Sequence, residues 1–210
     1  MPPPAPGDRE ARRKDVSEAV WQVLAARGFG GLTLRAVAAA MGVSTGMLTH
    51  YFPSKRALVT HALDLLEENT AQRSRRARPS AGLGGARAVL LDLLPLTPAD
   101  AGRSRIWVSS WDLSLADDAL SAQQADRYTR LRATLRPFFE TARARGEIPA
   151  GDPEHLAAAA VAFAHGLVVQ ALFAPGRFPE EVQIAMLDDF LTGLTLPRPP
   201  AGGGGPSPGR

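Results

Sequence analysis

Helical periodicity runs through nearly the whole chain and is the feature that most limits its fold. Within residues 8–27, apolar side chains recur three or four positions apart and so form one face of a helix: Val16, Ala19, Val20, Val23 and Leu24. Runs that alternate apolar and polar residues between turns, which are typical of β-strands, do not occur in the sequence. The chain is therefore predicted to be all-α.

Capping residues, glycines and prolines divide this periodic sequence into about nine helices. Thr33 and Ser44 are suited to cap the second and third helices, and Pro137 is expected to kink the seventh. The helices are expected over residues 8–27, 34–41, 44–52, 53–78, 86–94, 97–115, 117–145, 152–174 and 179–194.

The 20 glycines and 18 prolines are densest at the two ends of the 210-residue chain. Residues 1–8 and 197–210 are therefore expected to be disordered tails. The rest is predicted to divide into a three-helix domain over residues 9–54 and a larger helical domain over residues 55–196, with a linker at residues 79–85.

The formal net charge of +3 is unevenly distributed. Residues 1–78 carry +5, whereas residues 79–210 carry −2. This asymmetry indicates a polyanionic partner for the N-terminal region alone. The chain has no cysteine, which excludes disulfides, thiolate zinc sites and a cysteine nucleophile, and which fits a cytoplasmic location.

Residues 156–174 form a nearly continuous apolar run, long enough to compare with a membrane span. The run is mostly alanine and valine, and it contains His165 and Gln170. It is therefore predicted to be a helix buried between protein surfaces, with no membrane as a partner. The N-terminus lacks the basic start and apolar run of a signal peptide, which again favours the cytoplasm.

Residues 34–52 have the pattern of a helix-turn-helix. Val37 and Ala38 are expected to face inward, and Ala38 is small enough for two helices to cross over it. Gly42 can adopt the positive φ that a tight turn requires. The second helix of the pair then exposes small or polar side chains suited to a DNA major groove: Thr45, Gly46, Thr49 and His50.

The stretch GGLTLRAVAAAMGVSTGMLTHYFPSKRAL resembles the DNA-binding domain of TetR-type transcriptional repressors. The resemblance is close over about residues 12–64. It includes the Thr33 cap, the combination of Ala38 with Gly42, and the run from Tyr51 to Lys55.

Three later segments, residues 105–111, 146–153 and 165–167, resemble the betaine-pathway subgroup of these repressors. His165 stands where that subgroup usually has aspartate, so the resemblance does not carry a ligand with it. The resemblance implies long helices around a ligand pocket and a dimer formed by the last two helices.

For DNA binding, the resemblance implies phosphate contacts and base-facing positions on neighbouring elements. Tyr51 as a core aromatic and His50 as a solvated helix residue are the alternatives. Met47 is suited to touch a thymine methyl group. The expected DNA-binding residues are Thr33, Thr45, Gly46, Met47, Thr49, His50, Tyr51 and Lys55.

Trp107 and Trp111 form an aromatic stripe that fits either core packing or the wall of an effector pocket. A cage of these two rings would suit a quaternary ammonium, although two tryptophans alone do not make a cage. Candidates for binding a small-molecule effector are Trp107, Trp111, Phe138, His165 and Gln170. The homodimer is expected to be a four-helix bundle through Leu167, Val168, Ala171, Leu187, Phe190 and Leu191.

The predicted function is a ligand-responsive transcriptional repressor that binds a palindromic operator as a dimer and is released by a small molecule. An activator of the same fold and a helical enzyme are the alternatives. No enzyme activity, cofactor or metal is expected, because the four histidines show no HExxH motif and the sequence has no Gly-x-Ser-x-Gly elbow.

Overall fold

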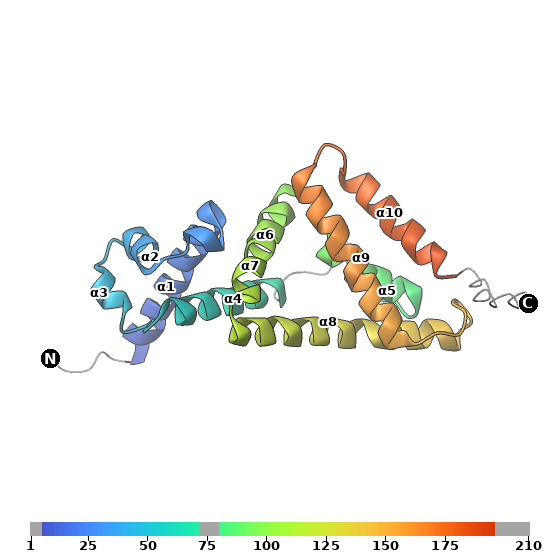
Figure 1. Ribbon diagram of the computed structural model, residues 1–210, viewed down its shortest axis with the longest axis horizontal. Helices are drawn as coiled ribbons and strands as arrows, with labels where there is room; N and C mark the ends of the chain where they lie inside the picture. Colours follow the sequence, from blue (N-terminus) through green and yellow to red (C-terminus); the bar gives the residue numbers. More distant parts are fainter. Residues whose placement is uncertain (1–5, 72–79, 196–210) are drawn as a thin grey trace, which may run out of the picture.

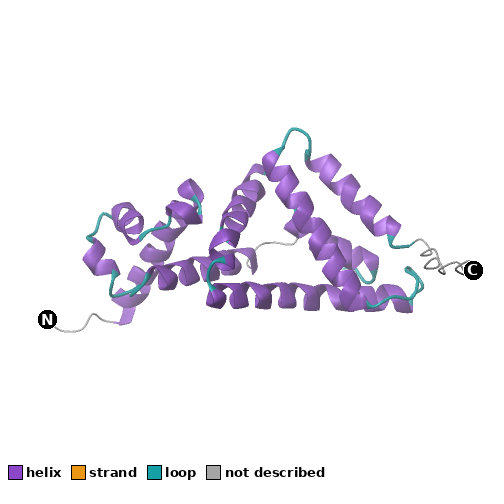
Figure 2. Ribbon diagram, viewed as in Figure 1, coloured by secondary structure: helices purple, strands orange, loops and turns teal. Residues whose placement is uncertain are grey.

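The computed structural model describes residues 6–71 and 80–195, and these are almost entirely helical (Figures 1 and 2). They form ten α-helices and one 3-10 helix, with no strand among them, so the all-α prediction is confirmed. The elements are α1 (Pro6–Arg27), η1 (Phe29–Gly31), α2 (Leu34–Met41), α3 (Thr45–Leu48), α4 (Lys55–Ala71), α5 (Leu83–Leu93), α6 (Pro98–Ser109), α7 (Trp111–Leu115), α8 (Asp118–Ala144), α9 (Pro153–Phe173) and α10 (Glu180–Gly193).

Parts of the predicted tails, linker and fourth helix, namely residues 1–5, 72–79 and 197–210, lie outside the described residues. α1 begins at Pro6, within the segment expected as an N-terminal tail. The division into domains at residue 54 stays a prediction.

Two boundaries differ from the prediction for local reasons. The helix expected over residues 97–115 is two helices, because the chain turns at Ser110, whose backbone N–H and hydroxyl both donate to the Trp107 carbonyl. α5 starts three residues early, at Leu83. The Glu147 carboxylate accepts from the Leu83 N–H at 2.8 Å and so caps the helix from far along the chain.

α8 is 27 residues long and is not interrupted at Pro137. The missing N–H of this proline removes one backbone bond. The Thr141 hydroxyl donates to the Pro137 carbonyl at 2.8 Å, one turn farther on.

The N-terminal core is formed mainly by α1 to α4, at one end of the molecule in Figure 1, and also includes Ile106 of α6 and Leu120 of α8. Val20, Val37 and Leu48 are fully buried in it. α4 contributes fully buried residues to the same core, including Leu58 and Leu66. Each buried leucine of this kind stabilises the fold by roughly 1.5–3 kcal/mol, so α4 is firmly attached to the helix-turn-helix.

The C-terminal core lies among α5, α8, α9 and α10. α9 packs along α8 through small residues, since Ala157, Ala160 and Ala164 are fully buried. Phe139 on α8 is the largest side chain fully buried here. α6 lies between the two cores and contacts α1, η1 and α9.

By length and composition, α9 is the one helix among the described residues that is long and apolar enough to cross a membrane. Eight of its residues are buried inside the protein. Its packing in the C-terminal core accounts for its inner face, while its outer face is exposed.

Candidate functional site

The helix-turn-helix is shaped by contacts between close neighbours in the sequence. The Thr33 hydroxyl accepts from the Ala36 N–H at 3.1 Å and caps α2. Gly42 follows α2 with φ 67° and ψ 28°, the left-handed conformation that favours glycine. This turn sets α3 against α2, with Leu48 fully buried between them.

The outer face of α3 and the turn after it is open to solvent. Thr45, Gly46, Thr49 and His50 are exposed, whereas Met47 is half-buried. The regular helix ends at Leu48, earlier than predicted, and continues as hydrogen-bonded turns to Phe52. Among these small side chains, the Thr49 hydroxyl donates to the Gly46 carbonyl at 2.7 Å, which fixes its position.

The start of α4 lies directly after this exposed face. The Ser54 hydroxyl accepts from the Ala57 N–H at 3.1 Å, and Lys55 is exposed in the first turn. Tyr51 is 37% exposed and is not part of the N-terminal core. A hydroxyl, an ammonium group and a helix N-terminus thus follow the exposed face of α3 within five residues of sequence, a combination suited to phosphate oxygens.

Arg56, which the sequence analysis did not single out, connects this region to the C-terminal part. Its guanidinium lies 2.6 Å from the Asp117 carboxylate, which also caps α8 by accepting from the Ala119 and Leu120 N–H groups. Desolvation raises the pKa of Asp117, but the backbone donors and Arg56 outweigh it and hold the pKa below its usual value.

A cavity of about 320 Å³ lies among α4, α5, α6, α7, α8 and α9. Three of the five residues expected to bind the effector line it: Trp107, Trp111 and His165. Its wall also holds charged side chains that sequence reasoning missed, among them Glu67 and Arg127. The cavity therefore combines aromatic surface with buried charge.

His165 stands between this cavity and a second hollow of about 540 Å³ on the outer face of α9. The rings of Trp111 and Tyr128 meet it edge-on, with centroids at 6.0 and 5.4 Å. Burial lowers the pKa of His165, so its imidazole is neutral at neutral pH.

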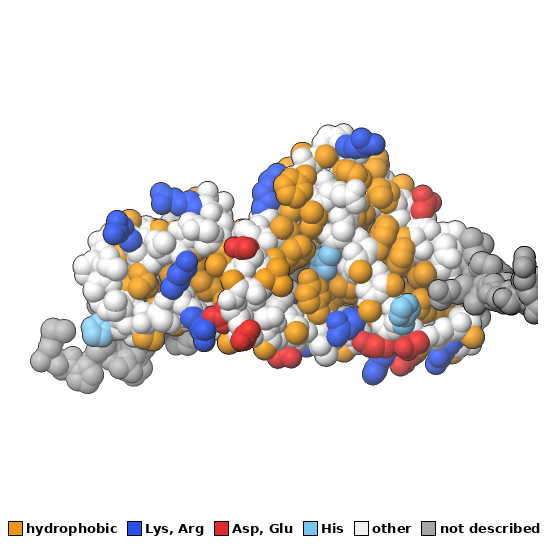
Figure 3. All heavy atoms as spheres, viewed as in Figure 1, with side chains coloured by type: hydrophobic (Ala, Val, Ile, Leu, Met, Phe, Trp, Pro, Cys, Tyr) orange, Lys and Arg blue, Asp and Glu red, His pale blue; other side chains and the backbone are white. Residues whose placement is uncertain are grey.

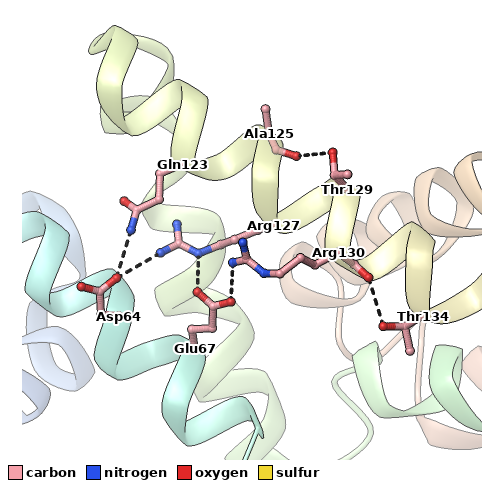
Figure 4. Close-up of polar contacts among 8 residues, drawn as sticks. All are labelled: Asp64, Glu67, Gln123, Ala125, Arg127, Thr129, Arg130 and Thr134. Atoms are coloured by element: carbon pink, nitrogen blue, oxygen red, sulfur yellow. Dashed lines mark hydrogen bonds and ion pairs between the residues drawn. The ribbon is translucent and has the colours of Figure 1, made fainter.

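Arg127 on α8 is the centre of a polar network that reaches α4 (Figure 4). Its Nε donates to Glu67 at 3.1 Å, and Arg130 donates to the other oxygen of the same carboxylate at 2.5 Å. Gln123 donates to Asp64, one turn earlier on α4, at 3.0 Å. Desolvation raises the pKa of Glu67, but the hydrogen bonds from Arg130 and Arg127 outweigh it and the pKa is lowered.

Phe138 and Gln170 line neither cavity. Phe138 lies over α5, where the position of a β-carbon on Gly85 would be 2.3 Å from its ring. Gln170 is exposed and its side chain bonds the Gly166 carbonyl of its own helix. It stands about 140° around α9 from His165, since each residue of a helix turns by about 100°, so the two cannot face one cavity.

The residues expected at the dimer interface need correction. Leu167, Val168, Ala171, Leu187 and Leu191 are all buried within the single chain. Phe190 is half-buried and stacks on Phe163 with ring centroids 4.4 Å apart. These side chains hold α9 and α10 to their own core.

Two family profiles match the chain. The profile of the bacterial regulatory proteins of the tetR family matches residues 18–62. The profile of the C-terminal domain of BetI-type transcriptional repressors matches residues 84–196, more than half of the chain. The two matches correspond to the two cores of the structure.

Relatives resemble the chain over nearly its whole length. The HTH-type transcriptional regulator BetI of Burkholderia thailandensis is 29% identical over 199 residues, which cover 93% of this chain and 99% of that protein. BetI of Burkholderia ambifaria is 28% identical over 194 residues, covering 90% and 96%.

Solved structures share the fold. A transcriptional regulator from Rhodococcus has a TM-score of 0.71 at 23% identity, covering 86% of this chain and 94% of that one. A putative regulator from Saccharomonospora viridis, solved in complex with choline, has a TM-score of 0.69 at 21% identity, covering 87% and 96%.

Proposed function

Because the chain belongs to the TetR family of bacterial regulatory proteins and has a BetI-type C-terminal domain, we propose that it is a repressor that binds a palindromic operator as a homodimer and is released by a small molecule. Family membership itself makes the chain a DNA-binding transcriptional regulator and not an enzyme. Such a regulator works beside DNA, in the cytoplasm. The observation that carries the proposal is the exposed, small-residue face of α3 beside the capped start of α4.

On the operator, α3 enters the major groove. Thr45, Gly46 and Thr49 lie against base edges, because their small side chains allow close approach, and Met47 and His50 flank them.

The phosphate contacts come from both sides of this helix. The Thr33 hydroxyl uses a lone pair to cap α2 and keeps its hydrogen for a phosphate oxygen. Tyr51 and Lys55 reach the backbone from the far side of α3, and together the contacts fix the orientation of the recognition helix.

The dimer forms through the outer faces of α9 and α10. Figure 3 shows hydrophobic side chains gathered over these helices. On α9 the exposed stripe consists of small residues, Ala158, Ala162 and Gly166, and ends in Phe173, which is 84% exposed. Small residues let two helices approach closely, as a four-helix bundle at a two-fold axis requires.

The effector acts through the helices shared by the cavity and the N-terminal core. α4 carries Glu67 in the cavity wall and Leu58 in the N-terminal core. α6 carries Trp107 in the wall, and its Ser109 hydroxyl accepts from the Phe29 N–H at 3.3 Å. A ligand that changes the occupancy from 99:1 to 1:99 must favour the released state by about 5.5 kcal/mol.

The test is operator selection from random DNA, followed by binding to the selected sequence across a range of salt. Lys55→Ala should lower the slope of log K against log salt by about 1, since one phosphate contact is lost. Arg105→Ala is the matched control, because it removes one exposed charge from α6 and should leave the slope unchanged. Selection that enriches no sequence would contradict the proposal, and a reporter gene under the operator gives the sign of regulation.

A further inference from the structure

The geometry points to an anionic effector: we propose that the cavity binds a carboxylate attached to an apolar group. The Arg127 guanidinium holds the carboxylate, and Trp111 and Tyr128 lie against the apolar part. The inference rests on the proposed function, because it names the chemical class of ligand for the cavity that controls DNA binding.

Arg127 has hydrogen-bond donors in the cavity wall that lack acceptors. The residue is 8% exposed, and only its Nε has a hydrogen-bond acceptor, Glu67. Both terminal nitrogens are buried and have no hydrogen-bond acceptor among the described residues. Asp64 forms an ion pair with Nη2 at 3.7 Å, a distance too long for a hydrogen bond. Buried donors generally have a partner, and a planar carboxylate matches the fork of a guanidinium.

The cavity wall holds three arginines and three carboxylates, namely Arg103, Arg127 and Arg130 with Glu67, Asp92 and Asp100. One carboxylate, Glu67, is shared by Arg127 and Arg130. Asp100 accepts from Thr97 and pairs with Arg103. The Nε of Arg103 lines the same cavity and is also buried without an acceptor among the described residues. Two guanidiniums therefore offer donors to one cavity.

The aromatic surface does not present a site for a cation. The Cζ atom of Arg127 lies 5.4 Å from the centroid of the Trp107 ring, so this indole face already holds a cation. The other two rings, Trp111 and Tyr128, flank His165, which burial keeps neutral. A quaternary ammonium against these rings would share the cavity with the buried Arg127 guanidinium and would be repelled by it. Val108, Leu131 and Val168, which also line the cavity, suit the apolar part of the ligand.

The same guanidinium couples ligand binding to the DNA-binding part of the protein. Arg127 holds α4 through Glu67, and α4 packs into the N-terminal core. A carboxylate on the terminal nitrogens competes with Glu67 for the positive charge and weakens this tie. Binding therefore favours a different placement of α4.

The experiment compares ligands with the same apolar body on the full-length protein. Three probes share a phenylalkyl body, namely 3-phenylpropanoate, 3-phenylpropan-1-ol and phenethyltrimethylammonium, and choline is added as a cation without it. Binding is measured by calorimetry and by tryptophan fluorescence. The carboxylate should bind at least about tenfold more tightly than the alcohol, and both cations more weakly than the alcohol.

Two arginine variants distinguish a direct contact between Arg127 and the carboxylate from a general effect of positive charge. Arg127→Gln should abolish the preference for the carboxylate. Arg136→Gln removes a positive charge from an exposed side chain of the same helix that lines neither cavity, and it should retain the affinity within about threefold. If Arg127→Gln fails to fold by circular dichroism, Arg127→Lys replaces it. The lysine keeps the charge but loses the fork, and it should weaken carboxylate binding by at least about threefold.

Equal binding of carboxylate and alcohol, tighter binding of either cation, no saturable binding of any probe, or equal effects of the two glutamine variants would each overturn the inference. Operator binding is measured on the same samples without ligand. A protein that binds its operator but shows no carboxylate preference contradicts this inference alone. A protein that binds the carboxylate but selects no DNA contradicts the proposed function alone.

Discussion

Side-chain hydrogen bonds that shape the helix-turn-helix span three residues of sequence, whereas several that join distant helices, at the cavity and beyond it, span sixty or more. Thr33 bonds Ala36 and Thr49 bonds Gly46. By contrast, Arg127 bonds Glu67, 60 positions away, and Arg87 bonds Asp188, 101 positions away. The first region can form its shape locally, but the second acquires its chemistry only when distant helices pack. The shape of the DNA-binding surface is thus fixed by local contacts, whereas the shape of the effector site depends on the relative positions of distant helices.

The largest expected effect tests whether the two cores are separate cooperative units. Phe139→Ala should destabilise the C-terminal core by about 3–5 kcal/mol, because a fully buried ring is removed. Urea unfolding measures the loss, and hydrogen exchange locates it in α5, α8, α9 and α10. Leu115→Ala, at a position 84% exposed, should change stability by less than about 0.5 kcal/mol. An equal rise in hydrogen exchange through α1 to α3 would show that the two cores unfold as a single cooperative unit.

The Gly166→Glu substitution tests whether the outer face of α9 is needed for operator binding by the N-terminal helices. No atom lies within 4 Å of a β-carbon built at Gly166, so the protomer should fold, but a charge in the dimer interface should separate the copies. Operator affinity should fall about 100-fold or more, since the two half-sites are no longer bound together. Sedimentation and DNA titration measure both effects. Ala122→Glu, exposed on α8, is the control for charge, and a dimeric Gly166→Glu protein would refute the interface.

Gly42→Ala should cost about 1–2 kcal/mol, because the residue has φ 67° and an added β-carbon meets no atom within 4 Å. The loss is therefore purely conformational. Gly193→Ala, in the last turn of α10 with equally open space, should not destabilise the protein. Thermal unfolding distinguishes the two, and an equal response would show that the turn is not held by its backbone conformation.

Glu67→Gln should have the smallest effect and one that depends on pH. The folded protein lowers the pKa of Glu67, so this carboxylate stabilises the fold above its ordinary pKa of 4.5, and the contribution is lost as the pH falls through the lower, folded value. Because the side chain is 41% exposed, the contribution is below about 1 kcal/mol. Urea unfolding from pH 7 down to about 3 should show a flatter acid decline in the variant, and parallel curves would contradict this role.

Local patterns were sufficient to predict the helix-turn-helix, because a cap, a small residue and a left-handed glycine act within a few positions. Residue type alone pointed to Trp107, Trp111 and His165 as pocket candidates, and their role in binding stays a prediction. The face of α9 was not predictable in the same way. A helix that is apolar nearly all round gives no signal of which side meets its own core, so buried residues such as Leu167 were assigned to the dimer.

Arg127 was missed for the opposite reason. A charged residue in a long, arginine-rich helix is normally expected in solvent, and only the packing of α4 and α6 against α8 encloses it. The signal that was available in the sequence is the pair of carboxylates at Asp64 and Glu67, spaced three apart on one side of α4.

The exposed apolar stripe on α9 implies that the activity of this regulator depends on its own concentration. If that face is covered only by a second copy, the thermal midpoint should rise with protein concentration, because association stabilises the folded form by mass action. In a cell with few copies, the number of dimers would then fall faster than the number of molecules. Gene dosage would therefore affect operator occupancy even when the effector concentration is constant.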